Sequence, residues 1–100
     1  MYVILSSKPG QFRTELVDGL VAVEAYDYLF YGRMTAQYVI AELAHPVKLK
    51  VVEETDSAAP PLINYVPSKF LEKFDTLEDA RAELRHLASF GSMDIALVKR

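Results

Sequence analysis

The alternation of apolar and polar residues predicts short strands in the first part of the chain. Residues 2–5 are β-branched, aromatic or aliphatic, and the sequence KPGQ at 8–11 then supplies the residue types of a tight turn. A return strand is expected over 11–16. Asp18 and Gly19 favour a second two-residue turn, after which a third strand would begin at Leu20. The pattern therefore predicts consecutive hairpins.

The segment 20–31 is apolar on both of its predicted faces. A period of two residues places Val21, Val23, Ala25, Asp27, Leu29 and Tyr31 on one face and Ala22, Glu24, Tyr26, Tyr28 and Phe30 on the other. A strand in a small antiparallel sheet usually has one solvated face. The second apolar face therefore has to be covered by a helix, by a sheet that closes on itself, or by another subunit.

Two interpretations compete for residues 35–43, which follow an expected turn at Gly32 and Arg33. As a helix, the segment would have Thr35 as its N-cap and an apolar face at a spacing of 3.6 residues. As a strand, it would form a hairpin with 20–31. The strand is preferred because the central residues 38–40 are aromatic or β-branched, which lowers helix propensity.

The second half of the chain contains a break, a strand and a loop. His45 and Pro46 interrupt regular structure, and residues 47–51 then alternate between apolar side chains and lysines. Three of the five prolines fall within 55–67, which is expected to be a loop. Residues 68–74 alternate as in another strand, although Pro67 is also suited to start a helical turn.

One helix is expected over 77–90. Thr76 is a good N-cap, and the acidic residues at 78 and 79 lie where the helix dipole favours negative charge. An apolar stripe follows at helical spacing, and Gly91 is expected to end the helix before a final strand over 93–98. The stripe consists of Leu77, Ala80, Leu84, Leu87 and Ala88.

These elements predict a single α+β domain over residues 1–100. The expected fold is an antiparallel meander of about six or seven strands, curled or partly closed, with helix 77–90 packed on one face. At 100 residues the chain has the length of one domain, and its composition, 51% hydrophobic and 25% charged, is that of a globular protein.

Charge and composition exclude several classes of function. The net charge of −3 has the wrong sign for non-specific binding to nucleic acid, and the lack of cysteine excludes disulfides and thiolate metal sites. His45 and His86 have no partner at a metal-ligand spacing, so no metal or cofactor is expected. Without a signal peptide or an apolar run long enough to span a membrane, we expect no membrane contact and a cytoplasmic location.

Asp27 is the one carboxylate that suggests catalysis. It lies among apolar side chains on its predicted face, where burial would raise its pKa and make it usable as a general acid or base. The structural alternative is an ion pair with Arg13 or Arg33 from a neighbouring strand.

The aromatic residues predict a ligand pocket or a protein interface. The candidate residues are Tyr26, Tyr28, Phe30, Tyr31, Arg33 and Tyr38. The first hypothesis is a non-catalytic accessory or binding module that forms a homodimer through residues 20–31. The alternative is a small enzyme or small-molecule binder with a tyrosine-lined pocket, in which Asp27 acts as acid or base and Arg33 or Arg13 orients an anionic substrate. Besides a second copy of the chain, the partners expected from this pattern are another protein or a small molecule.

Overall fold

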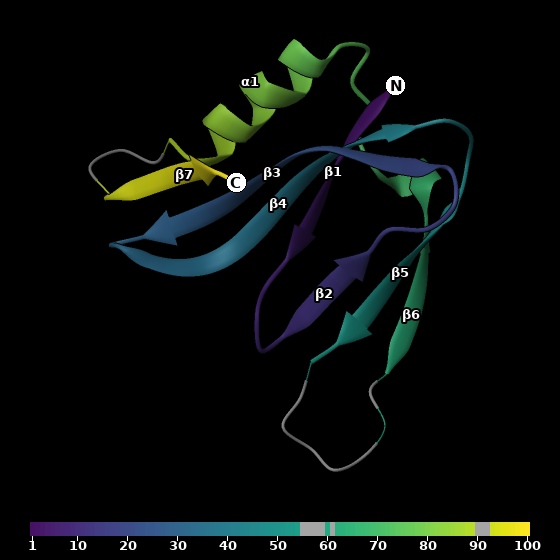
Figure 1. The fold of residues 1–100 in the computed structure, drawn as a ribbon, viewed down its shortest axis with the longest axis horizontal. Helices are drawn as coiled ribbons and strands as arrows, with labels where there is room; N and C mark the ends of the chain where they lie inside the picture. Colours follow the sequence, from purple (N-terminus) through teal and green to yellow (C-terminus); the bar gives the residue numbers. More distant parts are fainter. Residues whose placement is uncertain (55–59, 61, 90–92) are drawn as a thin grey trace.

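The chain folds into three layers, as seen in the computed structural model of Figure 1. The structure describes residues 1–54, 60, 62–89 and 93–100. Helix α1 (Leu77–Leu87) lies on one side of a four-stranded sheet, and a three-stranded sheet lies on the other side. The predicted α+β class with antiparallel strands is confirmed. The single meander is wrong, because the strands divide between two sheets, and neither sheet closes on itself within the described residues.

The four-stranded sheet has the strand order β1-β4-β3-β7. Its strands are β1 (Tyr2–Ser7), β3 (Leu20–Phe30), β4 (Arg33–Leu43) and β7 (Ile95–Lys99). The strand interpretation of 35–43 is therefore confirmed. The final strand, expected over 93–98, is also confirmed and pairs antiparallel with the second half of β3.

The three-stranded sheet has the strand order β2-β5-β6. It consists of β2 (Phe12–Glu15), β5 (Lys48–Glu53) and β6 (Ile63–Pro67). Leu49 of β5 is opposite Val66 of β6, and both side chains face the four-stranded sheet. Lys48 and Lys50 alternate with Leu49, as the sequence predicts.

Two apolar clusters hold the layers together, one on each face of the four-stranded sheet. Between the sheets lie the buried residues Val3, Leu5, Leu20, Ala41, Leu43 and Leu49. Between the four-stranded sheet and α1 lie Ile40, Ala80 and Leu84, with Tyr26 and Tyr38 packed against them. Of β3, Leu20 lies in the cluster between the sheets and Tyr26 packs against the cluster under α1, so the chain itself covers only part of each face of this strand.

Helix α1 begins as its sequence predicts. The Thr76 hydroxyl accepts a hydrogen bond of 3.1 Å from the Asp79 amide, which is the N-cap contact. Ala80 and Leu84 from the predicted stripe are buried, while Arg85 and His86 face solvent. The helix ends at Leu87, and Ala88 is its C-cap. The expected end of the helix at Phe90 and Gly91 lies outside the described residues.

The two predicted hairpins before Leu20 are wrong, although both turns form. The Gln11 and Phe12 amides donate to the Lys8 carbonyl, and Gly19 has a φ of 95°. The strands beyond these turns nevertheless separate, because β1 pairs with β4 and β2 pairs with β5. Local turn chemistry sets where the chain reverses, whereas the pairing depends on which distant strands bury the apolar side chains.

Two further assignments between residues 55 and 74 need correction. The end of the expected loop is strand β6, which pairs with β5, while residues 55–59 and 61 of that loop lie outside the described residues. The strand expected over 68–74 is instead a short 3-10 helix (Ser68–Phe70) followed by an isolated bridge at Phe74. The alternative of a helical turn after Pro67 is the one confirmed.

None of the helices in the described part of the chain combines the length and the apolar character that crossing a membrane requires.

Candidate functional site

The β3–β4 hairpin carries most of the candidate residues. Tyr31 and Gly32 form its two-residue turn, with φ angles of 51° and 79°. Positive φ at both positions is typical of the turn that matches the natural twist of paired strands. Phe30 and Arg33 are consequently paired directly, so the turn lies one residue earlier than expected.

A bulge in β3 changes which side chains face the helix. The pairing with β4 shifts between Ala22, which is opposite Ala41, and Glu24, which is opposite Ile40. Ala41 belongs to the cluster between the sheets and Ile40 to the cluster under α1. Ala22 and Glu24 therefore lie on opposite faces, and the strict alternation predicted for 20–31 is wrong at Val23.

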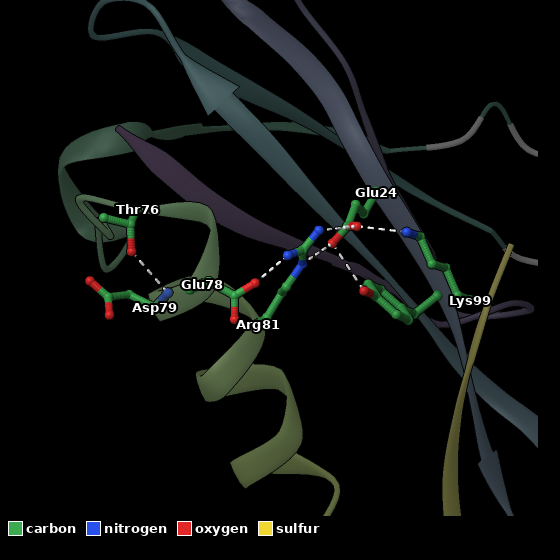
Figure 2. Close-up of polar contacts among 7 residues, drawn as sticks. Glu24, Thr76, Glu78, Asp79, Arg81 and Lys99 are labelled. Atoms are coloured by element: carbon green, nitrogen blue, oxygen red, sulfur yellow. Dashed lines mark hydrogen bonds and ion pairs between the residues drawn. The ribbon is translucent and has the colours of Figure 1, made fainter.

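The Glu24 carboxylate is the centre of a polar cluster between β3, β7 and α1 (Figure 2). Its side chain is only 5% exposed. Oε1 accepts hydrogen bonds from Arg81 Nε at 2.8 Å and from the Tyr26 hydroxyl at 3.0 Å. Oε2 accepts from Arg81 Nη2 and from Lys99 Nζ, both at 2.7 Å. Glu78 binds the same guanidinium from the exposed side of the helix.

The cations around Glu24 keep it ionised. Hydrogen bonds from Arg81 and then from Lys99 outweigh the effect of burial, and they hold the pKa of Glu24 well below its usual range. The carboxylate is therefore a fixed negative charge, which joins α1 and β7 to the central strand. Because it does not exchange a proton near neutral pH, this cluster has a structural character rather than that of a general acid or base.

The tyrosines of the candidate set are divided rather than gathered around one pocket. Tyr26 lines a cavity of about 230 Å³ on one side of α1, together with Arg81, Leu84, Arg85 and Leu97. Tyr38 lines a second cavity of about 230 Å³ with Ile4, Ser6, Glu72, Phe74, Glu83 and Leu87. Neither Tyr28 nor Tyr31 is in the lining of these two cavities.

Tyr38 packs between the helix and a neighbouring ring. Its ring is 5.9 Å from that of Tyr28, in an edge-to-face arrangement. Burial raises the pKa of the Tyr38 hydroxyl, and the nearby Tyr28 adds to the effect. For Tyr26, burial is again the main cause of a raised pKa, followed by the hydrogen bond to Glu24. Both phenols thus stay protonated at physiological pH, and the Tyr26 hydroxyl is a hydrogen-bond donor to Glu24.

Asp27 is not brought together with the tyrosines that face the helix. It alternates with Tyr26 and Tyr28 along β3, which places it on the opposite face of the sheet. Its carboxylate accepts a hydrogen bond of 2.8 Å from Arg100 Nε. The structural alternative of an ion pair is therefore observed with a different arginine, because Arg13 binds Glu15 in the other sheet. Arg33 is exposed beside the hairpin turn.

The end of the four-stranded sheet nearest the β3–β4 turn exposes apolar side chains. Phe30 and Tyr31 contact each other, with ring centroids 4.7 Å apart, and Tyr31 is 59% exposed. Met34, which is opposite Leu29 at the start of β4, is 41% exposed. We call this group, Phe30, Tyr31 and Met34, the aromatic end. It includes two of the six residues predicted as a ligand or interface site.

Sequence reasoning missed Glu24 and Arg81. Glu24 is a single acid among the aromatic residues of its predicted face, which is the same signal that singled out Asp27. Arg81 falls one turn after Leu77 and three residues before Leu84, so it borders the apolar stripe of the helix. One acid on the apolar face of the strand and one base beside the apolar stripe of the helix were therefore the available indication that Glu24 and Arg81 would form an ion pair.

Within the described ranges, no group of three or more histidine, cysteine, aspartate or glutamate side chains is arranged to hold a metal ion. Comparison with protein families, with curated proteins and with solved structures found no match for this chain.

Proposed function

We propose that this protein is a small, non-catalytic binding module that forms a homodimer through the aromatic end of its four-stranded sheet. The observation that carries the proposal is the exposure of Phe30, Tyr31 and Met34 around one turn, beyond the part of β3 that α1 covers. Aromatic residues and methionine are enriched at the centres of protein interfaces. Soluble monomers rarely leave large apolar patches exposed unless the patch serves an interaction.

The alternative of a tyrosine-lined pocket with a catalytic Asp27 has less support. The two cavities beside α1 contain one tyrosine each, and Asp27 lies on the other face of β3 with Arg100. An arrangement for acid or base catalysis needs a titrating group within reach of a bound substrate. An interface at the aromatic end requires only a second apolar surface and no titrating group. A cytoplasmic location stays a prediction from the sequence.

The test is the mass of the protein in solution, measured by sedimentation over a wide range of concentration. Tyr31→Asn is a sharp variant, because asparagine tolerates the positive φ of this turn position and should leave the hairpin folded while removing the exposed ring. We expect a dimer whose dissociation constant rises at least about tenfold in Tyr31→Asn.

Val21→Asn is the matched control. Val21 is an exposed apolar residue, 66% exposed, at the opposite end of the same strand. Its replacement should leave the dissociation constant unchanged. A protein that stays monomeric at millimolar concentration would refute the proposal, and so would equal effects of the two substitutions.

A further inference from the structure

The two edges of the four-stranded sheet differ in how they are covered. At the β1 edge, Tyr2 and Phe74 exchange two main-chain hydrogen bonds of 2.8 Å, and the Thr14 hydroxyl donates to the Ser6 carbonyl. At the β7 edge, no main-chain hydrogen bond to another segment is found among the residues that the structure describes. An uncovered edge presents unpaired amides and carbonyls that suit another strand.

The pairing of β7 with β3 determines which groups point outward. The Tyr31 amide donates to the Asp94 carbonyl, and the Arg100 amide donates to the Ala25 carbonyl. In an antiparallel pair the hydrogen-bonded residues alternate. Ala96 and Val98 therefore also bond to β3, whereas Ile95, Leu97 and Lys99 direct their amides and carbonyls toward the free edge.

The β7 edge also lacks the features that usually prevent strand addition. Edge strands are commonly protected by charges or prolines. From Ile95 to Val98 the strand has neither. The two charges that follow are turned back toward β3, because Lys99 Nζ binds Glu24 and Arg100 Nε binds Asp27. These ion pairs hold β7 in place from both faces of the sheet and leave its edge free of a repelling charge.

We propose that two copies of this chain join through their β7 edges, as antiparallel strands related by a two-fold axis at Leu97. This inference rests on the proposed homodimer and specifies its geometry. Leu97 would pair with Leu97 of the second copy, and Ile95 with Lys99. The two four-stranded sheets would then form one continuous sheet, in which the outward amides and carbonyls of β7 are satisfied.

The register centred on Leu97 is the one that pairs the whole strand. It also keeps the positive charges apart, because each Lys99 faces an isoleucine, whereas a register centred on Lys99 would place two ammonium groups opposite each other. Ile95 is next to Phe30 within the sheet. The aromatic end of each copy would therefore lie near the same seam, with only β7 between Phe30 and Lys99 of the other copy.

Disulfide cross-linking tests the register directly, because the chain contains no cysteine. In this register Ala96 of one copy is directly opposite Val98 of the other, about 5 Å away, while two Ala96 residues are diagonal neighbours about 7–8 Å apart. Disulfides do not span Cα separations beyond about 7 Å. Both residues are exposed, so cysteine at either position should leave the fold intact.

The experiment mixes Ala96→Cys chains with Val98→Cys chains of different mass under mild oxidation. We expect the mixed disulfide to exceed either homodimeric disulfide at least about fivefold, since only the mixed pair has the required separation. A preference for either homodimeric product would overturn the register. Sedimentation of the same samples before oxidation separates the remaining outcomes: a dimer that yields no cross-link would overturn the β7 edge alone, and a strict monomer would overturn the proposed homodimer with it.

Discussion

Replacing Glu24 by glutamine tests whether this buried carboxylate holds the layers together. Glutamine has nearly the same shape, but one of its two terminal atoms is a donor, and the side chain is uncharged. That donor would face the groups that now donate to the carboxylate, which are Arg81, Lys99 and the Tyr26 hydroxyl. The variant therefore changes charge and hydrogen bonding while leaving packing almost unaltered.

The expected loss follows from the burial of each partner. Removing one member of a buried ion pair costs about 3–5 kcal/mol when the remaining charge stays buried. Here the cations are more accessible, with 31% of the Arg81 side chain and 57% of the Lys99 side chain exposed, so both can regain water. We expect Glu24→Gln to lower the free energy of unfolding by about 2–3 kcal/mol. For a domain of this size the melting temperature should fall by roughly 8 °C or more.

Chemical denaturation at pH 7 measures this difference, with Glu78→Gln as the matched control. Glu78 binds the same guanidinium, but 68% of its side chain is exposed. An exposed ion pair contributes little, so this variant should lose less than about 1 kcal/mol. Similar losses in the two variants, or no loss in Glu24→Gln, would show that the burial of Glu24 does not have the energetic role assigned to it.

The same pair of proteins gives a test by pH. Because the folded-state pKa of Glu24 lies well below its ordinary value of 4.5, its contribution is complete above that value and is lost as the pH falls below it. The difference in unfolding free energy between the wild type and Glu24→Gln should therefore shrink on acidification below pH 4.5. A difference that stays constant down to pH 2 would contradict the assignment.

Further predictions concern two turns and the N-cap of α1. At Gly19, with φ of 95°, an added Cβ would lie 2.7 Å from Val47 Cγ1, so Gly19→Ala should lower the unfolding free energy by about 2–3 kcal/mol. Gly32 has a similar φ but open space around it, and Gly32→Ala should cost only about 1 kcal/mol; equal losses in urea denaturation would contradict the steric reasoning. Thr76→Ala should cost about 1 kcal/mol through loss of the N-cap, with Thr76→Ser restoring most of it, and a failure of serine to restore stability would exclude the hydroxyl as the cause.

The parts of the fold set by neighbouring residues could be predicted from the sequence. The start of α1 depends on Thr76 and the amide of Asp79, only three residues apart. The β4 strand depends on residue types within one short segment, and so does the chain reversal at Gly32, although that turn begins one residue earlier than expected. In these places the local preference and the final structure agree, so the sequence pattern was sufficient.

The parts set by long-range contacts could not be predicted. The choice of β4 rather than β2 as the partner of β1 depends on which surfaces are buried together, and period-2 patterns do not encode it. The extra residue in β3 near Val23 reverses the faces beyond it without any signal in the alternation. Arg81, one of the partners of Glu24, lies 57 residues later, and Arg100, which binds Asp27, lies 73 residues later.

Amide hydrogen exchange in β7, measured residue by residue at high and low protein concentration, tests the homodimer most directly. The Ala96 and Val98 amides bond to β3 and should exchange slowly at both concentrations. The Ile95, Leu97 and Lys99 amides should be protected at least about tenfold more at high concentration, where the second copy covers them. Fast exchange of these three amides at every concentration, in a sample that sediments as a dimer, would contradict pairing through this edge.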